Sequence, residues 1–254
     1  SIKMMQETSI PNATPNIRLS LPSKGRPIED TMSFLSACGL SVFKPNPRQY
    51  QATISSLPDV LVLFQRPADI VVSVRDGSVD FGITGLDVVE EHKGTENQVL
   101  IMHEALGFGH CALTLAVPES WDTVTDINSL RSYVENLQRP VRIATKYPNL
   151  TSRFMQNLGI PFSLISAEGT LETIPAIGYA DMIADLVSSG QTLRDNRLRP
   201  LADGVILRSQ AVLIANINAL NKNPQVLATA RYLLEYFDAH LRARDNLAIF
   251  ANIR

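Results

Sequence analysis

Short apolar runs alternate with longer amphipathic stretches along most of this chain. The short runs have the length and β-branched content of strands, and the stretches between them have helical spacing and end at glycine. In the first half, strands are predicted at Ile17–Leu21, Val60–Phe64, Val79–Ile83 and Cys111–Val117, and helices at Thr31–Cys38, Asp69–Arg75 and from Thr84 onward. Alternating strands and helices predict an α/β fold with largely parallel sheets.

The same alternation restarts after Pro118. Strands are predicted at Val141–Thr145, Phe162–Ile165, Met182–Val187 and Ala211–Ala215, and helices at Leu150–Leu158 and Leu171–Ile177. Two similar halves, with the chain crossing between them twice, predict two lobes with a cleft between them. Ligands of such sheets bind at the carboxyl ends of the strands.

The last part of the chain contains a longer amphipathic helix, predicted at Pro224–Leu241. Asn223 suits its N-cap and Pro224 its first turn. The apolar run Leu247–Ile253 predicts a terminal strand, which needs a partner within the fold or in another subunit.

These elements divide the chain into five parts. We expect a flexible N-terminal tail at 1–16, the first part of lobe I at 17–110, lobe II at 111–205, a return to lobe I at 206–222, and a C-terminal helix and strand at 223–254.

Composition narrows the possible functions. The net charge of −2 gives no sign of a nucleic-acid-binding surface, and no apolar run is long enough to cross a membrane. The N-terminus lacks the apolar segment of a secretory signal, so a cytoplasmic location is expected. Cys38 and Cys111 fit free thiols in a reducing compartment. The histidines show no metal-ligand spacing, so no metal site built by the protein is predicted.

One loop points to a phosphate. Ser188, Ser189, Gly190, Gln191 and Thr192 follow the predicted strand Met182–Val187. Such a loop can turn backbone N–H groups and hydroxyls toward one phosphate group. Asp185, three residues earlier, could accept hydrogen bonds from sugar hydroxyls. The loop therefore predicts a phosphorylated ribose, although a strand, a turn and an ordinary Ser or Thr helix cap would have the same residues.

Several motifs occur together with this loop. In chain order they are Leu21–Arg26 (LPSKGR), Arg66–Ile70 (RPADI), Asp80–Asp87 (DFGITGLD), Ala144–Leu150 (ATKYPNL) and Asp185–Leu193 (DLVSSGQTL). Five ordered motifs are far more specific than any one of them. On them the chain resembles the ATP phosphoribosyltransferases, over Ile17 to about Asn218.

The resemblance implies a two-lobed fold like that of periplasmic binding proteins, with the active site in the cleft. It implies that N1 of the ATP adenine attacks C1 of the ribose of 5-phosphoribosyl 1-pyrophosphate, and that pyrophosphate leaves with help from Mg²⁺. It also implies a homo-oligomer. Long members of the family carry a C-terminal histidine-binding regulatory domain, and short members work with a separate regulatory subunit. Most of that domain is absent from this sequence.

The resemblance also assigns roles to residues. Asp185, Lys24 and Arg66 would be catalytic, the cations neutralising pyrophosphate or ATP phosphates. Glu172 and Asp185 would bind the ribose, with the 5-phosphate on Ser188, Ser189, Gly190, Gln191 and Thr192. The nucleotide side would be formed by Lys24, Gly25, Arg26, Arg66, Asp80, Thr84, Gly85, Asp87 and Tyr147. Taken singly, these are also ordinary surface cations, turn residues and helix caps.

Two other functions stay open. A two-lobed domain that binds or senses a small metabolite would have the same shape without turnover. A catalytically silent subunit that serves assembly is the other alternative. The phosphate loop together with Lys24 and Arg66 favours the enzyme.

Overall fold

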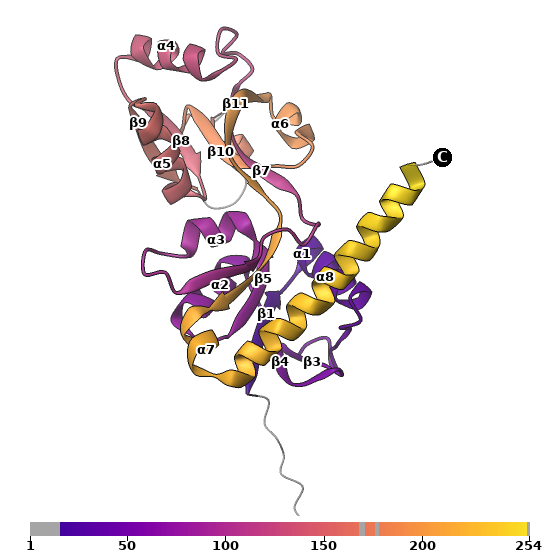
Figure 1. The fold of residues 1–254 in the computed structure, drawn as a ribbon. Coiled ribbons are helices and arrows are strands. Elements are labelled where there is room, and N and C mark those ends of the chain that lie inside the picture. Colours follow the sequence, from indigo (N-terminus) through magenta and orange to yellow (C-terminus); the bar gives the residue numbers. More distant parts are fainter. Residues whose placement is uncertain (1–15, 168–170, 176–177, 253–254) are drawn as a thin grey trace, which may run out of the picture.

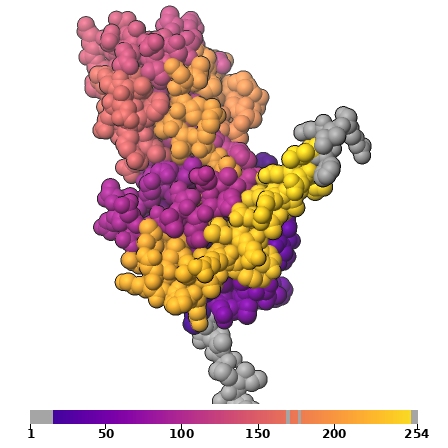
Figure 2. Space-filling model, viewed as in Figure 1, coloured from indigo at the N-terminus to yellow at the C-terminus, as the bar shows by residue number. Residues whose placement is uncertain are grey.

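The computed structural model describes residues 16–167, 171–175 and 178–252. Its strands form two separate sheets, one of seven strands and one of five. Each sheet is covered by helices and forms one lobe, and the lobes are stacked end to end (Figure 1). Figure 2 shows the same arrangement, with the C-terminal helix projecting from the lower lobe.

Lobe I is built on the seven-stranded sheet, whose strand order is β2-β3-β4-β1-β5-β12-β6. Its central strands β4, β1 and β5 are parallel, and the other neighbours are antiparallel. The strands are β1 (Ile17–Pro22), β2 (Val42–Phe43), β3 (Gln51–Ile54), β4 (Leu57–Gln65), β5 (Phe81–Gly85), β6 (Val99–His103) and β12 (Ala211–Asn216).

Helices cover both faces of this sheet. They are α1 (Gly25–Ala37), α2 (Pro67–Asp76), α3 (Leu86–His92), α7 (Ile217–Lys222) and α8 (Pro224–Asn252). On one face Phe34 of α1 meets Phe237 of α8 edge to face, with ring centroids 5.0 Å apart. On the other face, Ile70 and Val74 of α2 are fully buried against Val212 of β12. Two apolar layers thus hold the central strands in place.

Lobe II is built on the five-stranded sheet, in the order β11-β7-β10-β8-β9. Strands β10, β8 and β9 are parallel, and β7 is antiparallel to both of its neighbours. The elements are β7 (Cys111–Pro118), α4 (Ile127–Leu137), β8 (Val141–Thr145), α5 (Pro148–Leu158), β9 (Phe162–Ser166), the 3₁₀ turn η1 (Leu171–Thr173), β10 (Met182–Val187), α6 (Gln191–Asp195) and β11 (Leu198–Ser209).

The prediction of an α/β fold with two lobes is confirmed, but the sheets are mixed rather than largely parallel. The chain passes from lobe I to lobe II between β6 and β7, and returns at Gln210, between β11 and β12. A strand that follows another directly, without a crossover helix, enters its sheet antiparallel. Strands β2, β3 and β4 follow this rule and pair antiparallel. The strands beside the two crossings, β6, β7, β11 and β12, also run antiparallel to their neighbours, which the alternation of strands and helices did not reveal.

The predicted terminal strand Leu247–Ile253 is wrong, since α8 continues from Pro224 to Asn252. No glycine or proline follows Pro224, so nothing in the sequence ends the helix at Leu241. Short apolar runs fit helix and strand equally well, which is the source of the error. The helix predicted at Leu171–Ile177 is a 3₁₀ turn at Leu171–Thr173, and Ile177 lies outside the described residues, as do residues 1–15 of the predicted tail.

Candidate functional site

In lobe I the carboxyl ends of three parallel strands meet at one edge of the sheet. Pro22, the last residue of β1, pairs with Gln65, the last residue of β4, and β5 is in register beside β1. Each strand is followed at once, or within two residues, by a helix. The start of α1, α2 and α3 therefore lies at this edge, as it does in α/β proteins that bind ligands there.

The first turns of α1 and α2 have the character of an anion site. Their N-cap residues are Lys24 and Arg66, and neither helix has a side-chain cap. Both side chains are exposed, and neither forms an ion pair within the described part of the chain. Gly25 has a φ of 73°, which other residues rarely adopt, so the turn into α1 requires glycine. Free N–H groups beside two cations favour binding of phosphate oxygens.

In lobe II, Asp185 lies near the carboxyl end of β10. Its Oδ1 accepts a hydrogen bond of 2.8 Å from the Leu186 N–H group. Burial raises the pKa of Asp185, and the Glu172 carboxylate raises it further. The Leu186 hydrogen bond and the Lys146 ammonium act in the opposite direction and lower the pKa. The structure thus places Glu172 and Lys146 in the electrostatic range of Asp185.

The predicted phosphate loop directly follows β10. Gly190 is the N-cap of α6 and has a φ of 77°, a left-handed conformation suited to glycine. Ser188, Ser189, Gln191 and Thr192 are exposed, but the Gln191 side chain is not free. Its Nε2 donates to Asp195 Oδ1 at 2.8 Å, and its Oε1 accepts from Arg194 at 3.0 Å.

Asp87 and Tyr147 form a buried contact between the lobes. The Tyr147 hydroxyl donates to Asp87 Oδ2 at 2.6 Å, and only 7% of Tyr147 and 6% of Asp87 are exposed. Burial raises the pKa of Tyr147, and the Asp87 carboxylate raises it further. Because Tyr147 follows β8 and Asp87 follows β5, this bond shows that the carboxyl ends of the two sheets face each other. The ring of Tyr147 is therefore enclosed rather than open to a base.

Three other candidates lie apart from this junction or are buried. Asp80 precedes β5 and accepts a hydrogen bond from the Arg18 N–H at 2.9 Å, so it lies at the amino end of the strand, away from the other candidates. Arg26 points to solvent and pairs with Asp30 at 3.8 Å. Thr84 is buried on β5, and its hydroxyl has no hydrogen-bond partner among the described residues.

Lys146, Arg194 and Glu91 were not among the predicted site residues. Lys146 is exposed in the motif that also holds Tyr147, and its charge acts on Asp185. Arg194 lies over the predicted phosphate loop, where a methyl group at Gly190 would stand 3.4 Å from its guanidinium. Lys146 lies within the motif Ala144–Leu150, and Arg194 directly follows the motif Asp185–Leu193. Their closeness to these motifs in the sequence could therefore have identified them. Glu91 had no such signal, because its partners follow about sixty residues later.

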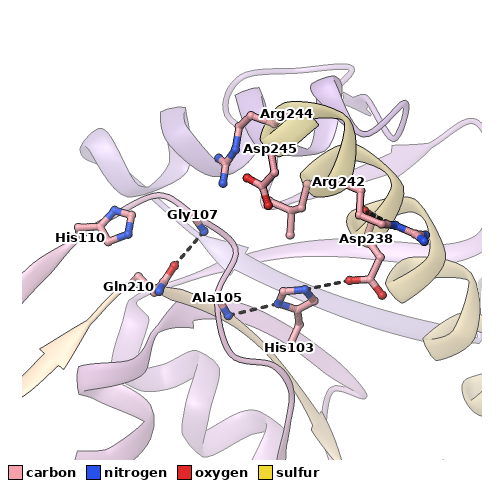
Figure 3. Close-up of a pocket in the computed structure, with 10 residues that line it drawn as sticks. His103, Ala105, Gly107, His110, Gln210, Asp238, Arg242, Arg244 and Asp245 are labelled. Carbon is pink, nitrogen blue, oxygen red and sulfur yellow. Dashed lines mark hydrogen bonds and ion pairs between the residues drawn. The ribbon is translucent and has the colours of Figure 1, made fainter. Parts of the chain in front are cut away.

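A cavity of about 730 Å³ lies elsewhere, between α8 and the segment joining β6 to β7 (Figure 3). Charged side chains from α8 face His103 and His110 across it, and His103 is paired with Asp238 at 3.1 Å. None of the predicted substrate-binding residues lines this cavity. The predicted site is therefore not this cavity but the junction where the carboxyl ends of the two sheets face each other.

No cluster of three or more metal-ligating side chains occurs among the described residues. Asp185 and Glu172 are two carboxylates on the lobe II side of the candidate site, near enough to interact electrostatically. Mg²⁺ is commonly held by one or two carboxylates together with substrate phosphates. The donor set therefore fits a magnesium ion that arrives with a pyrophosphate group. The described helices include none that is both long and apolar enough to cross a membrane.

Comparison with known proteins supports one family. The family model described as ATP phosphoribosyltransferase matches residues 66–235. The Arabidopsis thaliana protein named ATP phosphoribosyltransferase 1, chloroplastic, is 44% identical over 243 residues, which cover 94% of this chain and 59% of that protein. The chain thus spans less than two thirds of the length of this relative.

Two solved structures show the fold. An ATP phosphoribosyl transferase (HisG:HisZ) complex from Thermotoga maritima matches with a TM-score of 0.68 and 23% identity, covering 89% of this chain and 99% of that one. A probable amino-acid ABC transporter extracellular-binding protein from Bacillus subtilis matches with a TM-score of 0.52 and 12% identity, covering 91% and 92%. The binding-protein-like architecture expected from the sequence is confirmed.

Proposed function

The chain belongs to the ATP phosphoribosyltransferase family, and we propose that it transfers the 5-phosphoribosyl group of 5-phosphoribosyl 1-pyrophosphate to N1 of ATP. Pyrophosphate is released, and the reaction is the first step of histidine biosynthesis. One observation carries the proposal. The sheet edge of lobe II, with Asp185 and the phosphate loop, faces the edge of lobe I, where Lys24 and Arg66 begin two uncapped helices.

Lobe II is the proposed phosphoribosyl site. The 5-phosphate binds to N–H groups and hydroxyls of residues 188–192, and Arg194 adds a positive charge beside them. Asp185, supported by Glu172, accepts hydrogen bonds from the ribose hydroxyls. An anionic carboxylate at this position also favours the positive charge that develops on the ribosyl carbon as pyrophosphate leaves.

Lobe I is the proposed site of the nucleotide and of pyrophosphate departure. Adenine N1 carries a free lone pair, so the reaction needs no strong general base. The protein contributes by holding the two substrates in line and by neutralising the leaving pyrophosphate. Lys24 supplies a compact charge, and Arg66 can bind two oxygens at once. Thr84, whose buried hydroxyl has no hydrogen-bond partner among the described residues, lies on β5 near this end of the sheet.

A magnesium ion bound to the pyrophosphate would neutralise charge on the leaving group. Asp185 and Glu172 are the carboxylates that would reach it. The separate regulatory subunit and the homo-oligomer expected from the sequence remain proposals, supported by the complex named for the Thermotoga maritima protein. The cytoplasmic location also remains a proposal, since the plant relative is named as chloroplastic.

Identification of the product tests this function. The purified chain is incubated with both substrates and Mg²⁺, and the nucleotides are separated and analysed by mass spectrometry and NMR. The proposal predicts an ATP adduct with the ribosyl carbon bonded to N1. Binding of the substrates without an adduct would instead favour the metabolite-binding alternative.

A further inference from the structure

Two acidic side chains of α3 reach from lobe I into lobe II. Glu91 is 3% exposed and Asp87 is 6% exposed, which is unusual for carboxylates unless they are paired. They lie one helical turn apart, so both point from the same face of α3. Figure 1 shows α3 at the boundary of the lobes, next to α5.

Glu91 caps a helix of the opposite lobe. Its Oε2 accepts the Asn149 N–H at 2.9 Å, and its Oε1 accepts the Leu150 N–H at 3.0 Å. The Glu91 carbonyl also accepts a hydrogen bond of 3.1 Å from the Asn149 side chain. Helix α5 has no side-chain cap from its own N-cap residue, Tyr147. Lobe I therefore supplies the negative charge that the start of α5 would otherwise lack.

Asp87 joins three elements with one carboxylate. Its Oδ2 accepts the Tyr147 hydroxyl, and its Oδ1 accepts the Ser209 hydroxyl at 2.8 Å. Ser209 Oγ in turn accepts the Asp87 N–H at 3.0 Å. Ser209 ends β11, directly before the chain returns to lobe I at Gln210. Breaking a buried pair of this kind leaves its partner unsatisfied, so each bond resists opening of the junction.

The lobe II side of this contact is connected to the strand that carries Asp185. The Tyr147 N–H donates to Thr145 Oγ1 at 3.0 Å, and the Thr145 hydroxyl donates to the Ala184 carbonyl at 2.9 Å. Ala184 directly precedes Asp185. A rotation of α5 against α3 would therefore carry Asp185 and the following loop with it, because these parts of lobe II are bonded together.

We propose that Asp87 and Glu91 are positioning residues that set the angle between the lobes. With Tyr147 they form the α3–α5 latch, which holds Asp185 and residues 188–192 opposite Lys24 and Arg66. The latch touches neither substrate and acts through the placement of Asp185. This role in catalysis rests on the proposed phosphoribosyl transfer, whereas the mechanical role of the latch does not.

Two conservative variants test the latch. Tyr147→Phe removes one hydroxyl and keeps the ring, and Glu91→Gln removes one charge and keeps the shape. Tyr133→Phe, on a half-buried ring of the same lobe, and Glu90→Gln, on the same helix, are the matched controls. The readouts are kcat, the dissociation constant of 5-phosphoribosyl 1-pyrophosphate measured by calorimetry, and hydrogen exchange at the Asn149 and Leu150 amides.

In both latch variants we expect kcat to fall about tenfold, the scale on which the loss of one buried hydrogen bond acts. The dissociation constant should change by less than about threefold, since the 5-phosphate and the ribose of that substrate bind to lobe II and only its pyrophosphate reaches lobe I. A residue that served stability alone would not lower kcat while leaving the dissociation constant nearly unchanged. Exchange at the two amides should become faster in Glu91→Gln and stay unchanged in Glu90→Gln.

Unchanged exchange at Asn149 and Leu150 in Glu91→Gln, or a kcat within about twofold of the wild type in both latch variants, would overturn the proposal. The exchange and calorimetry need no turnover. A wild-type chain that binds the substrate but forms no product would therefore contradict the proposed function, and exchange would still decide whether the latch holds the lobes together.

Discussion

Replacing Asp185 with asparagine removes the charge at the proposed ribose site while keeping the shape of the side chain. The new amide would still offer an oxygen to the Leu186 N–H, from which Asp185 accepts a bond of 2.8 Å, so the end of β10 should stay intact. A hydrogen bond to an ionised group contributes about 1.5–3 kcal/mol, and one between neutral groups about 1 kcal/mol. For two ribose hydroxyls the difference is about 1–4 kcal/mol, or roughly 5- to 1,000-fold in kcat/KM.

The assay is the initial rate of product formation at several concentrations of 5-phosphoribosyl 1-pyrophosphate. Asp122→Asn is the control, because Asp122 is exposed in the same lobe and undergoes the same chemical change. Thermal unfolding of both variants should match the wild type. An Asp185→Asn enzyme with kcat/KM within about twofold of the wild type would refute the assignment of Asp185 to the ribose.

Three further predictions concern the phosphate loop and the core. Ser189→Asp should weaken binding of 5-phosphoribosyl 1-pyrophosphate by more than about tenfold through like-charge repulsion, as calorimetry would show, because Ser189 is exposed and the fold should tolerate the change. Asp181→Asn should lower the free energy of unfolding by about 1–2 kcal/mol at pH 7, measured in urea, since Asp181 accepts bonds from Arg139 and Arg142. Despite the opposing effect of burial, these bonds lower the pKa of Asp181. The difference from the wild type should therefore persist above about pH 4 and shrink as the pH falls below it. Gly82→Ala should cost about 1–3 kcal/mol in the same measurement, because its methyl group would stand 2.5 Å from Ile70 Cγ2.

The interior strands of both lobes could be predicted from the sequence. Val141–Thr145 and Met182–Val187 are strands with these bounds, because a short apolar run is what a strand buried on both faces requires. Gly159, which ends α5, was a reliable signal as well, since its φ of 67° favours glycine.

The peripheral elements were missed for two reasons. Strand β3 lies beside the edge strand β2, and Gln51–Ile54 alternates buried and exposed residues too briefly to stand out. Helix α1 begins at Gly25 rather than Thr31, because Gly25 and Pro27 resemble loop residues. Pro is nonetheless well tolerated in the first turn of a helix.

The candidate loop of lobe II was easier to locate from the sequence than the contact between the lobes, and its role as a phosphate site stays a prediction. The loop at 188–192 is continuous in sequence, so its residue types and its place after a strand could be recognised together. Asp87 and Tyr147 were assigned to the nucleotide from their motifs alone. Their buried pairing depends on how two lobes meet, and it joins residues sixty positions apart, which no local pattern records. Asp80 shows another limit. It belongs to the same motif as Asp87, but strand β5 separates the two residues, so they lie at opposite ends of that strand.

Pyrophosphate release by the purified chain tests the central claim most directly. The chain is supplied with ATP, 5-phosphoribosyl 1-pyrophosphate and Mg²⁺, with a coupled pyrophosphatase to pull the reaction forward, and ATP is omitted in the control. The account predicts release that requires ATP and falls sharply in Asp185→Asn. Release at the same rate without ATP, or no release from a chain that binds both substrates, would contradict it.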